Sequence, residues 1–231
     1  MKIRIKFKKT GAMKFVGHLD TMRYFQRAIR RAGIDISYTT GFSPHPIMSF
    51  ALPLGVGVES EGEYFDIQVN STDSSEHSIK FLNEQMAEGI EILSYRQLPD
   101  DAKKSMSLVE AADYVLTLRE GYTLFDGFKE GLDSFYSQPE INIVKQTKKS
   151  ERELDIKPLI FKLDFHDEKI YMQLKAGSVD NIKPGLVLEA FYRYIGNEMP
   201  EFAFQVRRLD LYTKNADNEF VSLEKSGAEI K

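Results

Sequence analysis

The sequence contains no cysteine among its 231 residues. Disulfides, Cys-based zinc sites, thiol catalysis and Cys-held iron–sulfur clusters are therefore excluded within this chain. Histidine is also scarce, and none of the four histidines has the close spacing of a metal-binding motif. We therefore predict no metal site and no cofactor in this chain.

Long apolar runs and the common catalytic motifs are absent as well. No apolar run reaches the roughly 18 residues that a membrane-spanning helix needs. The N-terminal stretch MKIRIKFKK alternates apolar and basic residues, which is typical of a half-buried strand rather than of a secretion signal. There is no P-loop, no GxSxG and no GxGxxG between a strand and a helix. We expect a cytoplasmic protein with no membrane partner.

The formal net charge of −4 conceals a segregation of charge along the chain. Residues 1–40 contain ten lysines and arginines against two aspartates, a balance of +8. Residues 58–101 contain eleven acidic residues against two basic ones, a balance of −9. Such asymmetry allows one surface to attract polyanions. The alternative is that the two segments neutralise each other in the fold.

The order of the predicted elements favours a ferredoxin-like domain over residues 1–99. Apolar periodicity predicts a strand over 2–8, a helix that begins near His18, and strands over 35–39 and 63–69. A helix over 74–88, with Asp73 as its N-cap, and a strand over 91–95 complete the unit. The order βαββαβ forms an antiparallel sheet with both helices on one face.

A polar linker over 98–107 precedes a second segment in which this order recurs. Strand patterns in ADYVLTL and INIVKQTK flank a helical pattern over 123–136, and IFKLDF and KIYMQLKA are typical of hairpin arms. Pro184 begins another helix, and FAFQVRRLDLYT forms a long final strand. We predict a second ferredoxin-like domain over residues 106–231, and so an α+β protein with two tandem ferredoxin-like domains.

The first predicted helix, in the stretch GHLDTMRYFQRAIRRAG, carries a row of arginines. They recur at i, i+4 and i+7 or i+8, so they share a face opposite the apolar residues. Guanidinium groups bind phosphate oxygens bidentately, which suits this face to a nucleic-acid backbone. With lysines of the first strand, the predicted nucleic-acid-binding residues are Arg23, Arg27, Arg30, Arg31, Lys6 and Lys8. The alternative is a solvated helix face.

The stretch GFSPHP places a histidine in a rigid loop. Pro44 and Pro46 flank His45 and restrict the backbone on both sides. Gly41 allows a positive φ or a close backbone approach. One interpretation is a preorganised loop that presents Ser43, His45 and Ser49 to a ligand. The other is a packed hairpin whose apolar residues belong to the core, namely Phe42, Met48, Phe50 and Leu52.

His18 lies at the start of the arginine helix, where backbone N–H groups and the helix dipole favour an anion. There it can donate to a phosphate or act as a general acid or base. Asp20 can instead cap the helix or orient His18. The predicted ligand-binding residues are His18, Asp20, Gly41, Ser43 and His45. No catalytic residue is assigned, and only if the protein is an enzyme are His18 and His45 the candidates.

Two stretches, GHLDTMRYFQRAIRRAGI and GFSPHPIMSFALPLGVGVESEGEYFDI, resemble a family of bacterial radical-SAM-linked proteins. These are domains of unknown function found beside or fused to radical SAM enzymes. The similarity covers about the first 70 residues, and SERELDIKPLI resembles a second, weaker signature. The resemblance implies a radical SAM enzyme as partner, in RNA- or ribosome-linked modification. Because this chain has no cysteine, the iron–sulfur cluster and S-adenosylmethionine would belong to that partner.

These observations together predict an accessory protein of a radical SAM enzyme, which binds RNA or presents a substrate for modification. One alternative is an RNA-processing or RNA-modifying enzyme that uses His18 and His45 as acid and base. The other is a protein–protein adaptor without RNA binding. No DNA specificity is expected.

Overall fold

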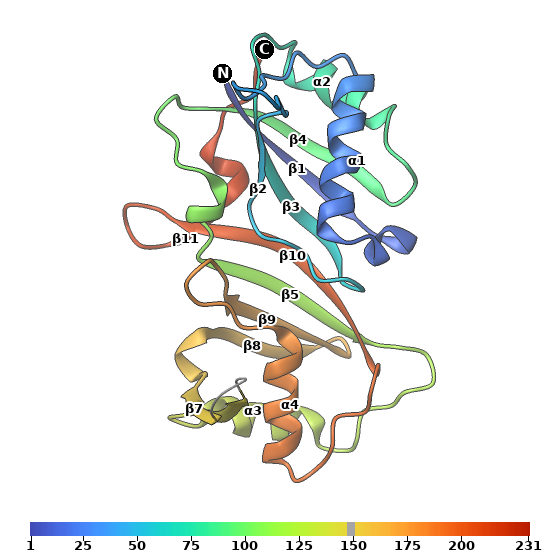
Figure 1. Ribbon diagram of the computed structural model, residues 1–231. Coiled ribbons are helices and arrows are strands. Elements are labelled where there is room, and N and C mark those ends of the chain that lie inside the picture. Colours follow the sequence, from blue (N-terminus) through green and yellow to red (C-terminus); the bar gives the residue numbers. More distant parts are fainter. Residues whose placement is uncertain (147–150) are drawn as a thin grey trace. The chain divides into compact units, whose positions relative to one another are not determined.

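The protein has a mixed α+β structure in the computed structural model, which describes residues 1–146 and 151–231 (Figure 1). The chain divides into two compact units, residues 1–110 with 208–231 and residues 111–207. The β-structure is mostly antiparallel, and the described residues include four α-helices. The predicted α+β class is therefore confirmed. No described helix is both long and apolar enough to span a membrane.

The sheet of the first unit is built around β1 (Lys2–Lys9). β1 pairs antiparallel with β3 (Glu59–Gln68) on one side and with β4 (Ile90–Leu98) on the other. The short strand β2 (Met48–Phe50) pairs antiparallel with β3. The resulting strand order is β4-β1-β3-β2, with β1 in the interior of the sheet.

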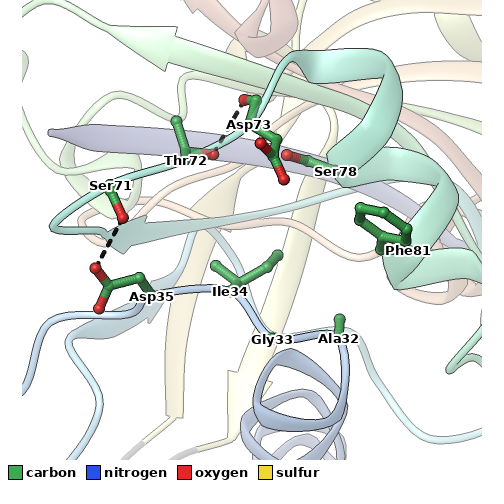
Figure 2. Close-up of a pocket in the computed structure, with 9 residues that line it drawn as sticks. All are labelled: Ala32, Gly33, Ile34, Asp35, Ser71, Thr72, Asp73, Ser78 and Phe81. Atoms are coloured by element: carbon green, nitrogen blue, oxygen red, sulfur yellow. Dashed lines mark hydrogen bonds between the residues drawn. The ribbon is translucent and has the colours of Figure 1, made fainter.

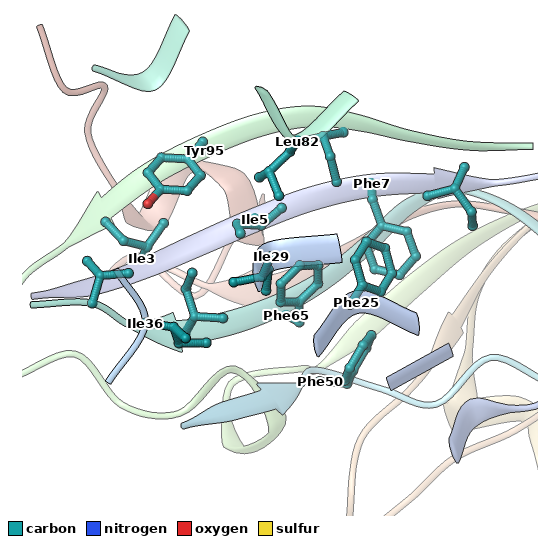
Figure 3. Close-up of a cluster of buried hydrophobic side chains, with 14 residues drawn as sticks. Ile3, Ile5, Phe7, Phe25, Ile29, Ile36, Phe50, Phe65, Leu82 and Tyr95 are labelled. Atoms are coloured by element: carbon teal, nitrogen blue, oxygen red, sulfur yellow. The ribbon is translucent and has the colours of Figure 1, made fainter. Parts of the chain in front are cut away.

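The core of this unit follows from the two-residue period of β1. Ile3, Ile5 and Phe7 are at most 1% exposed and share one face of the sheet (Figure 3). The ring of Phe7 packs against Phe25 and Phe65, with centroid separations of 4.7 and 5.6 Å. Each fully buried side chain of this kind stabilises the fold by roughly 1.5–3 kcal/mol.

Both helices of the first unit cover this same face. α1 (His18–Arg31) buries Phe25 and Ile29, which lie one helical turn apart, in the cluster that contains the β1 residues. α2 (Ser75–Asn83) adds Leu82 to the cluster. Figure 1 shows α1 and α2 on one side of β1, β3 and β4. The opposite face of β1 is therefore free to carry polar side chains.

The segment expected as a strand over 35–39 forms only isolated bridges. Ile36 pairs with Val69, and Tyr38 pairs with Pro46. Proline has no N–H to donate to a ladder, so the segment that contains Pro44 and Pro46 closes as a loop instead. The regular strand that pairs with β3 is β2, which begins after this loop.

The helix expected over 74–88 is shorter than its pattern indicates. Its N-cap is Ser74 rather than Asp73, and the Ser74 hydroxyl accepts a hydrogen bond from the His77 N–H at 3.3 Å. The helix ends at Asn83, whose amide group exchanges hydrogen bonds of 2.8 and 3.0 Å with the backbone of Ile92. A contact with β4 thus ends the helix.

The C-terminal residues belong to the first unit. From Arg208 onward, β10 (Phe204–Lys214) neighbours β3, and β11 (Phe220–Ser222) pairs with the end of β10. Further along, Gln97 and Ala228 exchange backbone hydrogen bonds of 2.8 and 2.9 Å. This segment therefore contributes residues to the surroundings of β1 and β3.

The second unit contains both strands and helices. Its elements are β5 (Ala111–Leu118), α3 (Phe128–Ser137), β6 (Asn142–Gln146), β7 (Glu151–Asp155), β8 (Ile160–His166), β9 (Lys169–Lys175) and α4 (Pro184–Tyr194). β9 pairs antiparallel with both β5 and β8, whereas β6 and β7 pair in a separate two-stranded sheet. The rings of Phe128 and Phe191 join α3 to α4 at 5.2 Å.

Candidate functional site

The arginines of α1 lie on the side of the helix that faces solvent. The apolar residues of α1 point to the sheet, which leaves Arg23 62% exposed and Arg27, Arg30 and Arg31 exposed as well. Among the described residues, no carboxylate forms an ion pair with Arg27 or Arg30. The donors of these two guanidinium groups are therefore available to a ligand.

Two of the four arginines have partners at the helix surface. Arg23 Nη1 donates to Asp20 Oδ1 at 3.2 Å, in a pair that is exposed on both sides. Arg31 donates to the side-chain and backbone oxygens of Gln85 at 3.3 and 3.0 Å. The N-cap of α1 is Gly17, which has no side-chain bond, so Asp20 partners Arg23 rather than capping the helix.

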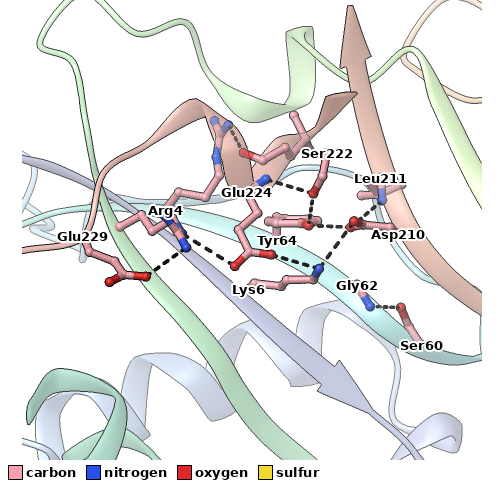
Figure 4. A network of polar contacts seen from close by, with 12 residues as sticks. Arg4, Lys6, Ser60, Gly62, Tyr64, Asp210, Leu211, Ser222, Glu224 and Glu229 are labelled. Atoms are coloured by element: carbon pink, nitrogen blue, oxygen red, sulfur yellow. Dashed lines mark hydrogen bonds and ion pairs between the residues drawn. The ribbon is translucent and has the colours of Figure 1, made fainter. Parts of the chain in front are cut away.

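The structure does not bring Lys6 and Lys8 to the arginine face. Lys6 points to the face of β1 opposite α1, where its Nζ lies 3.1 Å from Glu224 and 3.4 Å from Asp210 (Figure 4). Lys8 forms an ion pair with Glu91 of β4. Both lysines therefore balance carboxylates of their own unit.

A buried polar network surrounds Lys6 on that face of the sheet (Figure 4). Arg4 donates to both carboxylate oxygens of Asp66 at 2.8 and 3.0 Å and to the Leu223 carbonyl at 3.2 Å. The Tyr64 hydroxyl donates to Asp210, and burial together with this carboxylate raises the pKa of Tyr64. The network ties the C-terminal segment to β1 and β3.

His18 lines a small pocket between the start of α1 and the sheet. The pocket's polar lining is Lys9, His18, Thr21 and Glu63, and the imidazole packs edge-on against Phe50 at a centroid distance of 5.1 Å. Its volume of about 10 Å³ is room for one water molecule. A nucleotide or a small-molecule substrate does not fit there.

The charged side chains around this pocket are buried and hydrogen-bonded. Lys9 Nζ donates to the Val16 carbonyl at 2.5 Å, and Arg208 donates to both carboxylate oxygens of Glu63 at 2.7 and 2.5 Å. Burial lowers the pKa of Lys9 and the pKa of His18, while the Glu63 charge acts in the opposite direction on both. The neutral form of His18 is therefore favoured in the folded protein.

His45 lies in an exposed loop that its own hydrogen bonds hold in shape. The Thr39 N–H donates to the His45 carbonyl at 2.9 Å, and the His45 N–H donates to Thr39 Oγ1 at 3.1 Å. His45 Nδ1 is also 3.1 Å from Thr39 Oγ1. Gly41 has a φ of +113°, which glycine adopts without strain. Ser43, like Gly41 and His45, is exposed.

The packed-hairpin interpretation is wrong for Phe42, which is fully exposed. Phe50 is buried as that interpretation requires, whereas Met48 and Leu52 are half-buried. The loop tip over residues 40–45 is exposed throughout, beyond the bridge between Tyr38 and Pro46. The side chains at the tip are therefore open to solvent.

His18 and His45 are not brought together. His45 does not line the His18 pocket, and its ring contacts are Thr39 and the Ser43 carbonyl. Phe50, which contacts His18, follows His45 by five mostly extended residues, a span of about 16 Å at 3.3 Å per residue. The five predicted ligand-binding residues thus do not line one pocket, and this geometry provides no shared acid–base site.

A larger cavity lies between the end of α1 and the start of α2 (Figure 2). Its volume is about 230 Å³, and its lining includes Asp35, Ser71, Asp73 and Phe81. Asp35 accepts hydrogen bonds from Asn70 at 2.9 Å and from Ser71 at 2.8 Å, which lower the pKa of its carboxyl group. Two carboxylates make this cavity unsuited to a phosphate. Within the described part of the chain, no cluster of His, Asp and Glu side chains is arranged to hold a metal ion.

Sequence reasoning missed the buried cations beside His18, although one of them has a signal in the sequence. Lys9 continues the alternation of Ile3, Ile5 and Phe7, which places it on the core face of β1. Arg208 has no such signal, because its partner comes from a segment far away in the chain.

One protein family matches most of the chain. The family model described as an uncharacterized protein conserved in bacteria (DUF2344) matches residues 2–184. No curated protein matches the chain.

Proposed function

The chain belongs to the DUF2344 family of conserved bacterial proteins, and we propose that it is an RNA-binding accessory protein whose contact surface is the arginine face of α1. The arginine face consists of Arg23, Arg27, Arg30 and Arg31. The proposed role has no catalytic step in this chain, because His18 and His45 lack a common site.

The proposal rests on how the basic side chains of residues 1–40 divide between those held by partners in their own unit and those exposed to solvent. The cations of β1 and of the following turn are held within their unit. Some form ion pairs, namely Arg4–Asp66, Lys8–Glu91 and Lys14–Glu59, and Lys2 and Lys9 donate to backbone carbonyls. Arg27 and Arg30 are exposed and have no such pair among the described residues. An exposed row of guanidinium groups is the usual contact for phosphate oxygens.

The partner enzyme in this proposal is a radical SAM enzyme. Support comes from the resemblance of the stretches GHLDTMRYFQRAIRRAGI and GFSPHP to radical-SAM-linked proteins. The cluster and S-adenosylmethionine would belong to that enzyme, since this chain has no thiolate to hold a cluster. Binding RNA would then present the substrate to the partner in the cytoplasm.

The tandem ferredoxin-like arrangement is part of the same proposal. In the first unit it is supported by the order β4-β1-β3-β2 and by two helices that pack on one face of the sheet. The class of fold does not assign an activity by itself.

The proposal is tested by binding of the purified protein to cellular small RNA over a range of salt concentrations. The affinity of the wild type should fall steeply with salt, because phosphate contacts release counterions. The Arg27→Glu/Arg30→Glu variant should bind roughly tenfold or more weakly at low salt. Its log–log salt slope should be shallower by about 1.4, which is about 0.7 for each phosphate that an arginine no longer neutralises.

The matched control is Lys103→Glu/Lys104→Glu. This pair is exposed, lies outside α1 and changes the net charge by the same amount. It should leave the RNA affinity nearly unchanged. No binding at low salt, or an equal loss in both variants, would contradict a specific arginine contact surface.

A further inference from the structure

We infer that the RNA taken by the arginine face is single-stranded, and that unpaired bases stack on exposed aromatic rings of the segments that precede and follow α1 in the chain. This inference rests on the proposed function and specifies its ligand. The rings are those of Phe15, before the helix, and Phe42, in the loop that follows it. Neither residue belongs to the candidate sites predicted from the sequence.

Both rings are exposed to a degree that is unusual for phenylalanine. Phe15 is 65% exposed and Phe42 is fully exposed. Phenylalanine is among the residues most often buried, because its transfer from water to an apolar surrounding is strongly favourable. The Lys14 ammonium lies over the Phe15 ring, 5.5 Å from its centroid. The rest of that ring and the Phe42 ring are exposed and open to an external apolar surface.

Phe15 is held next to the start of the arginine row. It ends the 3-10 helix η1 (Gly11–Phe15), and the Lys14 carbonyl beside it accepts a hydrogen bond from the Gly57 N–H at 2.9 Å. Leu19, in the first turn of α1, is 61% exposed and precedes Arg23 by one turn. The exposed Phe15 and Leu19 side chains therefore lie at the start of α1 together with the exposed Asp20–Arg23 pair.

Phe42 is carried by a loop whose own backbone and side-chain contacts hold its shape. The bridge between Tyr38 and Pro46 closes the loop, and three contacts between Thr39 and His45 hold its shape. A ring on a preorganised loop loses little conformational entropy on binding. In this proposal the loop over residues 40–45, which includes His45, positions the Phe42 ring and has no catalytic role.

The combination of arginines with exposed rings selects the class of nucleic acid. Guanidinium groups contact phosphates in single strands and in duplexes alike. A duplex hides the faces of its bases inside the stack, and only unpaired bases can stack on a protein ring. A purely electrostatic duplex-binding surface has no use for Phe15 and Phe42, so the rings favour a single strand.

The test compares an unstructured RNA oligonucleotide with an RNA duplex of equal strand length, using the Phe15→Ala/Phe42→Ala variant. Both side chains are exposed, so the substitutions should leave folding intact. The variant should bind the single strand roughly tenfold or more weakly than the wild type does, because base–ring stacking is removed. Its affinity for the duplex and its salt slope should stay unchanged, since the arginines still bind the phosphates.

The matched control is Phe202→Ala, which removes an equally exposed ring, 74% exposed, from the second unit. It should bind the single strand as the wild type does.

The outcomes separate this inference from the proposed function. If the Phe15→Ala/Phe42→Ala variant binds the single strand with wild-type affinity while the Arg27→Glu/Arg30→Glu variant binds it more weakly, the stacking is overturned and RNA binding stands. The same result is expected if the two rings dock on a protein instead of on bases. A wild-type protein that binds the duplex more tightly than the single strand would also overturn the stacking. Failure of the wild type to bind any RNA would overturn both.

Discussion

Glu63 neutralises the buried charges around His18. Its carboxylate forms a bidentate pair with Arg208, and its charge also acts on Lys9 and on His18. Glu63, Arg208 and Lys9 are each at most 3% exposed. Desolvated charges of this kind are tolerated only when they are paired, so removal of one member leaves the others at a high free energy.

Arg208→Leu is therefore expected to lower the free energy of unfolding by about 3–5 kcal/mol, since it leaves the buried Glu63 carboxylate without its partner. Urea denaturation measures the change. In the double variant Arg208→Leu/Glu63→Gln the unpaired carboxylate is gone, and part of the lost stability should return, since the buried Lys9 cation then lacks the Glu63 charge.

The control for this prediction is Lys129→Ala, which breaks an exposed pair with Asp133 at 2.8 Å. Solvent already screens this pair, so its loss should change stability little. If the buried and the exposed substitutions cost the same, burial is not what makes the Glu63–Arg208 pair important.

His18 makes the stability of the first unit depend on pH. Burial lowers its pKa in the folded protein below the ordinary value of 6.5, with Lys9 acting in the same direction and Glu63 against it. Between the two pKa values the unfolded chain binds a proton that the folded chain does not, so stability falls as the pH falls from about 6.5.

His18→Gln should flatten this fall. Urea midpoints of both proteins between about pH 8 and pH 5.5 provide the measurement, because the carboxylates contribute equally to each. Parallel curves for the wild type and the variant would mean that His18 titrates alike in the folded and unfolded chains.

At the scale of elements, the close approach of β3 and β10 restricts one position to glycine. A methyl group on Gly62 would lie 2.5 Å from the Leu209 carbonyl oxygen and 2.6 Å from the Asp210 Cα. Both neighbours are backbone atoms, which cannot rotate away. The contact holds the strand that carries Arg208 against the strand that carries Glu63.

Gly62→Ala is therefore expected to destabilise the protein by about 2 kcal/mol or more, through overpacking between two backbones. The control is Gly185→Ala at the start of α4, where an added methyl group meets nothing within 4 Å. That change should be neutral or slightly stabilising. Thermal or urea unfolding of both variants measures the difference, and a tolerated Gly62→Ala would refute the tight approach.

At the scale of the whole molecule, the basic side chains of residues 1–40 fall into two groups. The cations of β1 lie on a sheet whose other strands carry acids, and several of them form ion pairs there, as in Arg4–Asp66 and Lys8–Glu91. The arginines of α1 lie on the solvent side of a helix whose buried residues, among them Phe25 and Ile29, pack against that sheet. A chain with a net charge of −4 can thus present a basic surface.

The sequence by itself determined the elements whose pattern is local. The alternation of Ile3, Ile5 and Phe7 predicted β1, and the spacing of Phe25 and Ile29 predicted α1 with its arginines outward. These predictions succeed because the periods of 2 and 3.6 residues follow from backbone geometry. The same local pattern failed for residues 35–39, where prolines in the adjoining loop prevented a regular strand.

Only the tertiary structure decided which side chains meet. Arg208 reaches Glu63 across 145 positions of sequence, and Lys6 is paired with Asp210 and Glu224 from the C-terminal segment. His18 and His45, only 27 positions apart in the numbering, do not share a site. Such pairings depend on how distant segments pack, and no local pattern encodes the distance between two elements. For this reason the arginine row could be predicted from the sequence, whereas the one-water pocket of His18 could not.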